Sequence, residues 1–323
     1  MIVALDLGFI FAVMALGVYI SFRILDFADL TVDGSFTSGA ATTAALIVAG
    51  VNPWLATAAA ILVGLAAGAI TGVLHAKGGI NPLLAGILTQ IALYSINLRI
   101  MGKANVPLLR ADTIVTPLRE AKVLGTPVSV LIFLAVAAVL TALLIWLLST
   151  DFGLAMQATG DNQAMIRSLG VNTDAMKIVG LALSNGLVAL CGALIAQYQG
   201  FADIGMGIGL IVAGLASVII GQAIFGQRTV LIAASAAVIG SVIYRLVIQL
   251  ALMIGFNPND MKLISAVLVV IALLLPRWDV VRRIGARRQE RLQKLTEPYG
   301  EGAAAVAATT GEHTTDAGQE NAR

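Results

Sequence analysis

The chain has 323 residues, of which 59% are hydrophobic and 12% are charged, and its mean hydropathy is +0.93. Soluble domains carry about 25% charged residues, so this composition excludes an ordinary soluble fold. The formal net charge of +2 does not favour nucleic acid or an acidic substrate. The single cysteine, Cys191, excludes a disulfide within the chain, and we expect it to serve helix packing.

Nine apolar runs are long enough, or nearly so, to cross a bilayer core, which needs roughly 20 residues. In chain order they are 2–22, 30–48, 54–74, 83–101, 128–148, 178–197, 208–225, 230–254 and the short run 263–275. None shows the alternation of a barrel strand, so we expect helices. The first run follows no positive charge, which argues against a removed signal peptide. The fold class is therefore an all-α integral membrane protein, a bundle of about nine (eight to ten) transmembrane helices.

Basic residues near the helix ends indicate the orientation in the membrane. Seven of them lie between Arg277 and Lys294, just after the last run, and predict a cytoplasmic C-terminus. Counting back through nine spans places the N-terminus outside. The connection 102–127 disagrees, because it would face outward while carrying Lys103, Arg110, Arg119 and Lys122.

Three regions follow from these patterns. Residues 1–276 are expected to form a transmembrane domain, in which 151–175 is a polar segment between spans, and residues 277–295 a basic juxtamembrane segment. Residues 296–323 are rich in Ala, Thr, Gly and Glu and lack apolar periodicity, so we expect a disordered tail.

Two short motifs recur in the same order in the two halves of the chain. Phe27-Ala28-Asp29-Leu30 is similar to Phe201-Ala202-Asp203-Ile204, and Gly79-Ile80-Asn81-Pro82 is similar to Gly255-Phe256-Asn257-Pro258. With nine spans the members of each pair lie on opposite sides of the membrane, as in the inverted repeats of transporters. We therefore expect an inverted internal repeat.

The polar segment 151–175 contains the pattern of a short helix. Asp161 is expected to cap its first turn, and Gly170 to take the left-handed conformation after its last turn. Ala164, Met165, Ser168 and Leu169 would then share one side and form a small apolar ledge. A surface loop that only joins two spans is the alternative.

Charged and amide side chains at membrane depth are costly and can mark a transport pathway, whereas structural hydrogen bonds between helices are the alternative. Arg245 stands out because it lies within a long apolar run and needs a partner. A metal site near Asp29 and Asp33 is not favoured, since no His or Cys accompanies them, and helix capping by either carboxylate is preferred. The pathway candidates are Asp29, Asp33, Ser35, Gln90, Asn97, Asn185, Gln222 and Arg245.

The segment from Asp151-Phe152-Gly153 through Ala158-Thr159-Gly160-Asp161-Asn162 to Gly170-Val171-Asn172 resembles the cytoplasmic coupling segment of one family of ABC importers. This is the branched-chain amino acid and ribose-type permease family. Stretches 26–36 and 214–226 agree with it, so the resemblance covers 1–277. Within the family the chain is most similar to the subgroup associated with tryptophan- or tyrosine-type binding proteins.

The resemblance implies a dimer of two permease copies, expected here to be a homodimer, with two cytoplasmic ATPase subunits and an external solute-binding protein. It also implies that the helix near 161–169 docks in a groove of the ATPase. The expected coupling residues are Gly160, Asp161, Asn162, Ala164, Met165, Arg167, Ser168, Leu169 and Gly170.

No Gly-x-x-x-x-Gly-Lys-Ser/Thr phosphate loop occurs, so ATP would be bound by the partner subunit, and the chain itself is expected to be no enzyme and to hold no cofactor. The leading hypothesis is the permease subunit of an ABC importer in the bacterial cytoplasmic membrane, with an amino acid as the expected solute. An ion-coupled secondary transporter is the alternative, as is a sugar or nucleoside as the ABC substrate.

Overall fold

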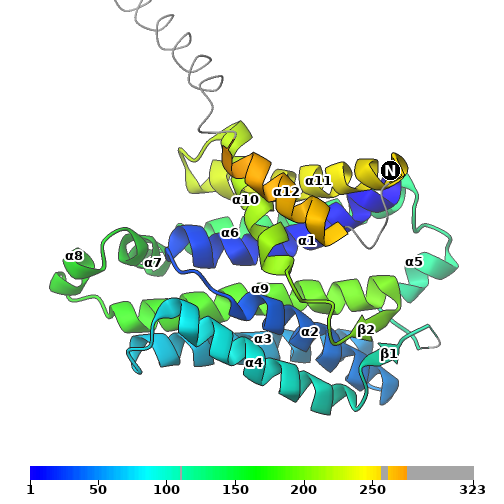
Figure 1. Ribbon diagram of the computed structural model, residues 1–323, viewed down its shortest axis with the longest axis horizontal. Coiled ribbons are helices and arrows are strands. Elements are labelled where there is room, and N and C mark those ends of the chain that lie inside the picture. Colours follow the sequence, from blue (N-terminus) through cyan, green and yellow to red (C-terminus); the bar gives the residue numbers. More distant parts are fainter. Residues whose placement is uncertain (110, 256–260, 275–323) are drawn as a thin grey trace, which may run out of the picture. The chain divides into compact units, whose positions relative to one another are not determined.

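The computed structural model describes residues 1–109, 111–255 and 261–274, and it is mostly helical over these ranges (Figure 1). The predicted juxtamembrane segment 277–295 and tail 296–323 lie outside the described residues. In chain order the elements are α1 (Ile2–Val18), the π-helix η1 (Tyr19–Ile24), α2 (Thr31–Val48), α3 (Pro53–Ala76), α4 (Pro82–Met101), β1 (Asn105–Pro107), α5 (Thr116–Glu120), α6 (Pro127–Leu148), α7 (Asp151–Asp161), α8 (Gln163–Ser168), α9 (Thr173–Gln199), β2 (Phe201–Asp203), α10 (Leu210–Phe225), α11 (Val230–Met253) and α12 (Met261–Leu274).

Each of the nine predicted apolar runs falls on a helix, and the first run continues without a break through α1 and η1. Six of the described helices are long and apolar enough to cross a membrane: α1 with η1, α3, α4, α6, α9 and α11. Helix α10 is apolar but shorter, and α2 is rich in Thr and Ser. A bundle of membrane helices is therefore established, while the count of nine spans stays a prediction.

Two of the spans, α3 and α4, begin at an Asn-Pro pair, in which Asn caps the helix and Pro is its first residue. Asn52 Oδ1 accepts a hydrogen bond from the amide of Trp54 at 2.9 Å, and Asn81 Oδ1 accepts one from Leu83 at 3.0 Å. Proline at the first helical position loses no bond, because that N–H has no partner within the helix. Asn81 and its proline belong to the second repeated motif; its counterpart at 256–258 lies outside the described residues.

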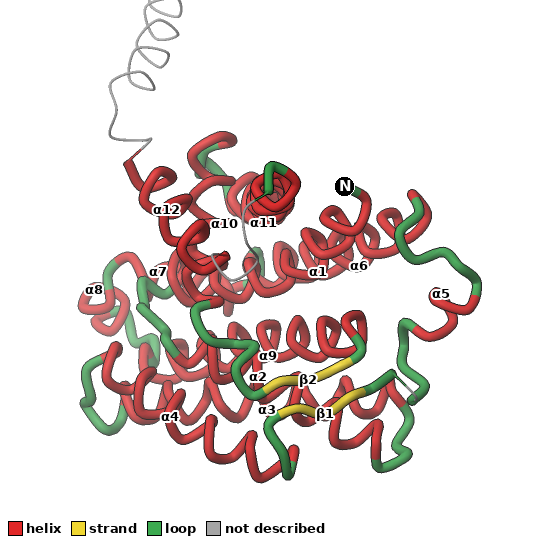
Figure 2. The backbone as a smooth tube through the Cα atoms, turned by 45° about the vertical axis from the view of Figure 1, so that its right-hand side comes forward, coloured by secondary structure: helices red, strands yellow, loops and turns green. Residues whose placement is uncertain are grey.

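Helix α9 packs against α1, α2 and α3 in the middle of the bundle (Figures 1 and 2). The spacing of three glycines in α3 explains one of these contacts. A Cβ atom on Gly64, Gly68 or Gly72 would overlap the backbone of α9, so the two helices approach at backbone distance. This glycine seam joins the second half of α3 to α9 between Ile178 and Ala189.

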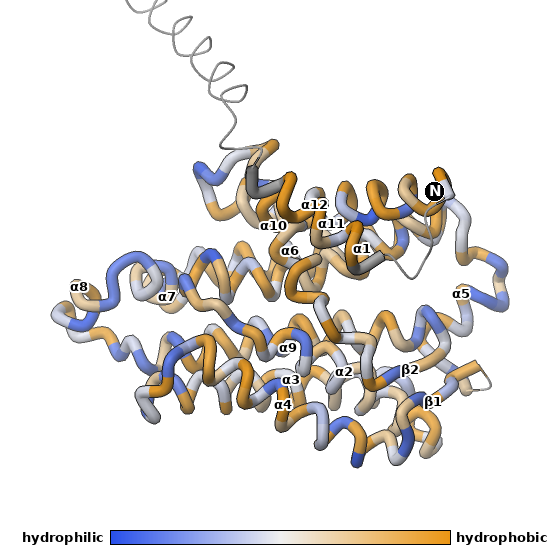
Figure 3. Tube along the Cα trace, viewed as in Figure 1, coloured by the Kyte–Doolittle hydropathy of each residue, from blue (hydrophilic) through white to orange (hydrophobic). Residues whose placement is uncertain are grey.

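The polar connections gather at the two ends of the helices. Helices α7 and α8 lie at one end, while α5, β1, β2 and the N-terminus lie at the other (Figure 1). Both ends are hydrophilic, and apolar residues dominate the helices between them (Figure 3). Strands β1 and β2 pair antiparallel, with Asn105 opposite Asp203 and Pro107 opposite Phe201. The distribution is that of a protein with two aqueous faces and an apolar belt.

Candidate functional site

The predicted coupling segment consists of two helices, α7 and α8, where one was expected. Their junction is Asn162, whose Oδ1 accepts a hydrogen bond from the amide of Met165 at 3.0 Å. The cap of α8 is therefore Asn162, and the expectation that Asp161 caps it was wrong: Asp161 is the last residue of α7. Gly170 has a φ of +89°, the left-handed conformation expected just after the last turn of α8.

Helix α8 presents an apolar edge to the outside. Ala164, Met165, Ser168 and Leu169 are all exposed, with Met165 at 60% and Leu169 at 68% of full accessibility. Apolar side chains that protrude from an otherwise polar end of a molecule indicate a surface that a partner covers. The use of this ledge for docking stays a prediction.

Helix α7 is fixed to the membrane helices beneath it. A Cβ on Gly160 would overlap the carbonyl oxygen of Ile24 at the end of η1, and one on Gly153 would overlap the backbone at the end of α6. Met156 is fully buried and packs into the main hydrophobic core. A displacement of α7 must therefore also displace the ends of η1 and α6.

A chain of buried polar groups crosses four elements at the start of α2. Asp29 accepts hydrogen bonds from the amide of Thr31 at 2.9 Å and from Asn185 Nδ2 of α9 at 2.6 Å. The Thr31 hydroxyl lies 2.8 Å from that of Thr71 in α3, which donates to Thr89 of α4 at 2.9 Å. The N-cap of α2 is Leu30, without a side-chain cap, and Asp29 instead accepts from the first amide of α2 and links this helix to α9.

Asp33 caps a different helix from its own. Its two carboxylate oxygens accept hydrogen bonds from the amides of Gly209 and Ile211, each at 2.8 Å, in the first turn of α10. These amides have no partner within α10, and the positive end of the helix dipole favours a carboxylate there. The starts of α2 and α10 are therefore joined.

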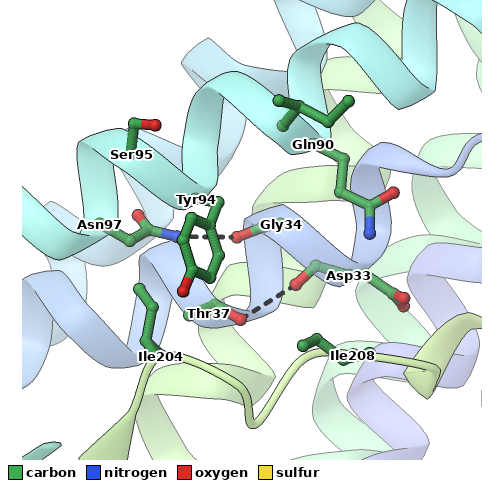
Figure 4. A pocket seen from close by; sticks show the side chains of 10 residues that line it. Asp33, Gly34, Thr37, Gln90, Tyr94, Ser95, Asn97, Ile204 and Ile208 are labelled. Atoms are coloured by element: carbon green, nitrogen blue, oxygen red, sulfur yellow. Dashed lines mark hydrogen bonds between the residues drawn. The ribbon is translucent and has the colours of Figure 1, made fainter. Parts of the chain in front are cut away.

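Three pathway candidates, Asp33, Gln90 and Asn97, line one cavity of about 440 Å³ between α2, α4 and the segment after β2 (Figure 4). Thr37, Tyr94 and Ser95 add three hydroxyl groups, and most of the remaining lining is isoleucine. Asn97 is 1% exposed and donates to the carbonyl of Gly34 at 3.4 Å, while its Oδ1 has no hydrogen-bond partner among the described residues.

The other candidates lie elsewhere. Ser35 Oγ and Gln222 Nε2 are buried without a hydrogen-bond partner in the described part of the chain. The Arg245 guanidinium lies 3.5 Å from the centroid of the Phe11 ring, so an aromatic face is a partner that the sequence did not suggest. Arg245 lines a separate cavity of about 410 Å³ together with Tyr244 and Ile248.

One buried carboxylate was missed. Asp6, 0% exposed in α1, accepts hydrogen bonds from Ser129 at 2.8 and 3.0 Å and from the Tyr198 hydroxyl at 3.2 Å. This cluster joins α1, α6 and α9 near the end that carries the N-terminus. The sequence contained an indication of this site, because Asp6 is the only charged residue in the first apolar run, 2–22.

Comparison with known proteins decides the family. Residues 1–274 match the family described as branched-chain amino acid transport system / permease component. The chain belongs to this family. It is 43% identical over 289 residues to the tyrosine transport system permease protein of Clostridioides difficile, which covers 89% of this chain and 95% of the relative. The resemblance noted in the sequence is thereby confirmed, and this membrane permease is by family a transport subunit of an ABC transporter.

Other relatives are more distant. The galactofuranose transporter permease protein YtfT of Escherichia coli is 29% identical over 275 residues, covering 81% of this chain and 76% of the relative. A solved structure, PsaBC from Streptococcus pneumoniae in complex with Fab, is similar with a TM-score of 0.49 and 18% identity, covering 83% of this chain and 89% of that chain.

Proposed function

We propose that this permease imports an amino acid, of the aromatic class, across the bacterial cytoplasmic membrane. The similarity to a tyrosine permease over nearly the whole chain carries the assignment of the solute. The cavity at Asp33 supports it, since it combines isoleucine side chains with the hydroxyls of Tyr94 and Ser95 and the amides of Gln90 and Asn97. An aromatic amino acid needs both kinds of lining.

The partners follow from the two polar ends. An ATPase subunit binds the exposed ledge of α8. When this subunit binds ATP it moves α8 and the adjoining α7, and the tight contact of Gly160 with Ile24 passes the movement to the end of η1. An external solute-binding protein delivers the amino acid at the opposite end, near α5 and β1. In this arrangement the end with α7 and α8, and the C-terminus of the chain, are cytoplasmic.

A second permease copy completes the pathway along α4. Helices α4 and α6 are equally exposed, since 28% of the residues in the most apolar stretch of each are buried. Helix α4 is nevertheless much less apolar than α6. Its accessible face includes Gln90, Tyr94 and Ser95. Such a face is costly against lipid, so it favours a water-filled path between two copies, whereas the face of α6 suits lipid.

The proposed inverted repeat relates α1–α4 to α9–α12. It is supported by equivalent packing: α1 packs on α11 as α9 packs on α3, and α2 packs on α3 as α10 packs on α11. Each Phe-Ala-Asp motif precedes one of the two helices that Asp33 joins.

The test of transport is uptake by proteoliposomes that contain the permease, its ATPase and its binding protein. Labelled tyrosine should accumulate only when ATP is supplied on the ATPase side, and unlabelled tyrosine should compete. Competition by galactofuranose with none by tyrosine would replace the amino acid by a sugar. Uptake driven by an ion gradient without ATP would contradict the proposal as a whole.

The test of the dimer is cross-linking of single cysteines. Ser95→Cys on α4 should form a disulfide-linked dimer on mild oxidation in membranes. Val136→Cys on the exposed face of α6 should not, and serves as the matched control. Cys191 is 0% exposed and should remain unreactive in both variants. Dimers from Val136→Cys alone would assign the interface to α6 and remove the pathway argument for α4.

A further inference from the structure

His75, in the last turn of α3, contacts three other parts of the chain. Its Nδ1 lies 2.8 Å from the carbonyl oxygen of Ile80, in the turn before α4. Its Nε2 lies 3.2 Å from the ammonium of Lys177 on α9. Its ring packs against that of Phe27 in a T-shaped arrangement, with 5.1 Å between the ring centroids. None of these contacts is used by the solute pathway described above.

The two polar contacts determine the protonation state of the ring. A carbonyl oxygen only accepts, so Nδ1 carries a proton, and an ammonium only donates, so Nε2 carries a lone pair. Both contacts fit the neutral ring with its proton on Nδ1. A proton on Nε2 would remove the acceptor and place a second positive charge beside Lys177.

Lys177 continues the connection to the coupling helix. Its ammonium also donates to Gln163 Oε1, at the start of α8, at 2.7 Å. Gln163 Nε2 lies 3.4 Å from the hydroxyl of Thr173 at the start of α9. Near the other end of α8, Arg167 and Asp174 form an ion pair at 2.6 Å. Helix α8 is thus held at both ends, and only its start is connected onward to α3.

The helix that carries His75 and the residue on the other side of its ring are also held in place. The glycine seam holds α3 against α9, so the distance between His75 and Lys177 changes little unless these helices separate. Phe27 is 3% exposed and belongs to the segment that leads to Asp29 and the start of α2. The ring therefore lies between the coupling helix and the segment that precedes the pathway.

We propose that neutral His75 is a positioning residue that aims the coupling helix α8 through Lys177 and Gln163, and that protonation of its Nε2 uncouples ATP hydrolysis from transport. This rests on the proposed coupling role of α8. His75 Nε2 holds Lys177, and Lys177 holds Gln163. The orientation of Gln163 therefore depends on a residue of α3, outside the coupling segment.

Several charges surround this contact. On α9, Lys177 faces the ring directly. Its charge interacts favourably with Asp174 of α9 and unfavourably with Arg167 of α8. On its own helix end, Lys77 is exposed. The segment before α2 contributes the uncharged ring of Phe27, and the turn before α4 contributes the carbonyl of Ile80. Because the nearest charge is positive, protonation of the ring weakens the contact.

The experiment measures solute molecules transported per ATP hydrolysed, in proteoliposomes containing the whole complex, with the same pH on both sides. When the pH is lowered until the ring is protonated, the wild-type ratio should fall about tenfold, because one hydrogen bond to a charged group is lost. His75→Gln offers an amide oxygen to Lys177 and does not titrate, so it should keep the high ratio and lose the pH dependence. Comparison of the two cancels titration of the partner subunits.

Two further variants test the same contact from both sides. His75→Leu keeps the packing on Phe27 but offers no acceptor, and Lys177→Met removes the donor, so both should show a low ratio at every pH. Lys77→Gln removes a charge from the same helix end without a contact to α8 and should behave as the wild type. Chain abundance and ATPase pull-down are measured for each variant.

The outcomes separate this inference from the proposed function. If the wild-type permease fails to bind the ATPase or to transport, the proposed function is wrong. If it transports but His75→Gln shows the same fall at low pH as the wild type, the role of His75 is refuted. A high ratio for a well-expressed Lys177→Met would refute the path through Lys177.

Discussion

Asp33 illustrates how a charged side chain at membrane depth can be stabilised by a neighbouring helix. Both of its oxygens are occupied by amides at the start of α10. The carboxylate is therefore compensated by a helix dipole, and its position in the cavity lining is fixed. Sequence alone supported capping by this residue but could not assign the helix, because 176 and 178 residues separate the partners.

Asp33→Asn should weaken the contact between α2 and α10. One carboxylate oxygen becomes an NH2 group that cannot accept from the α10 amide, and hydrogen bonds to charged groups contribute about 1.5–3 kcal/mol. We expect a lower thermal unfolding temperature of the purified permease and reduced solute uptake. Asp112→Asn, at an exposed position, is the control and should change neither. Unchanged stability of Asp33→Asn would show that the capping geometry is not important.

At the scale of elements, the helices were well predicted and their connections less so. The run 54–74 corresponds to α3 at Pro53–Ala76, because an apolar stretch bounded by a capping Asn-Pro pair has only one stable form in lipid. The break between α7 and α8 was missed, since Asn162 and Asp161 are both good capping residues and only the fold selects between them. The threonine chain from Thr31 to Thr89 was not predictable, as threonine is common in membrane helices that use it otherwise.

Packing of α2 on α9 should be sensitive to one methyl group. In Gly192→Ala, the new Cβ would overlap the carbonyl oxygen of Phe36, part of the α2 backbone, which cannot move away without displacing the helix. We expect a destabilisation of about 1–3 kcal/mol, measured by unfolding in mixed detergent. In Gly186→Ala, on the same helix, the nearest atoms belong to the end of the Leu65 side chain, which can rotate. A smaller effect of Gly192→Ala than of Gly186→Ala would contradict this description.

The exposed edge of α8 gives a sharper test of coupling. Ala164→Asp would bury an unpaired charge in the docking groove, at a cost of several kcal/mol, and should largely abolish co-purification of the ATPase. The permease itself should remain as abundant as the wild type, because Ala164 is exposed. Ala121→Asp makes the same change at an exposed position near α5 and should leave ATPase binding intact. Normal binding by Ala164→Asp would reduce the segment to a simple connection.

At the scale of the molecule, the two hydrophilic ends should face opposite compartments. Asn105→Cys in β1 and Met165→Cys in α8 place accessible thiols at the two ends, and the native Cys191 is buried. A membrane-impermeant maleimide should label Asn105→Cys in intact cells and Met165→Cys only after permeabilisation. The reverse result would invert the orientation, and labelling of both in intact cells would overturn the arrangement of the spans.

The contact between Asp29 and Asn185 has a consequence for how the protein is made. The two residues are 156 positions apart, and α2 presents many buried hydroxyls in addition to Asp29. At about 5–20 residues per second, a ribosome needs roughly 10–30 s to deliver α9 after α2. During that interval Asp29 lacks its partner on α9, and lipid offers none, whereas the hydroxyls of Thr31, Thr37 and Ser38 find partners within α2 or on α3. We therefore expect the insertion machinery to retain α2 beside the translocation channel until α9 arrives, so that release into the bilayer is delayed and the first four helices leave together with α9.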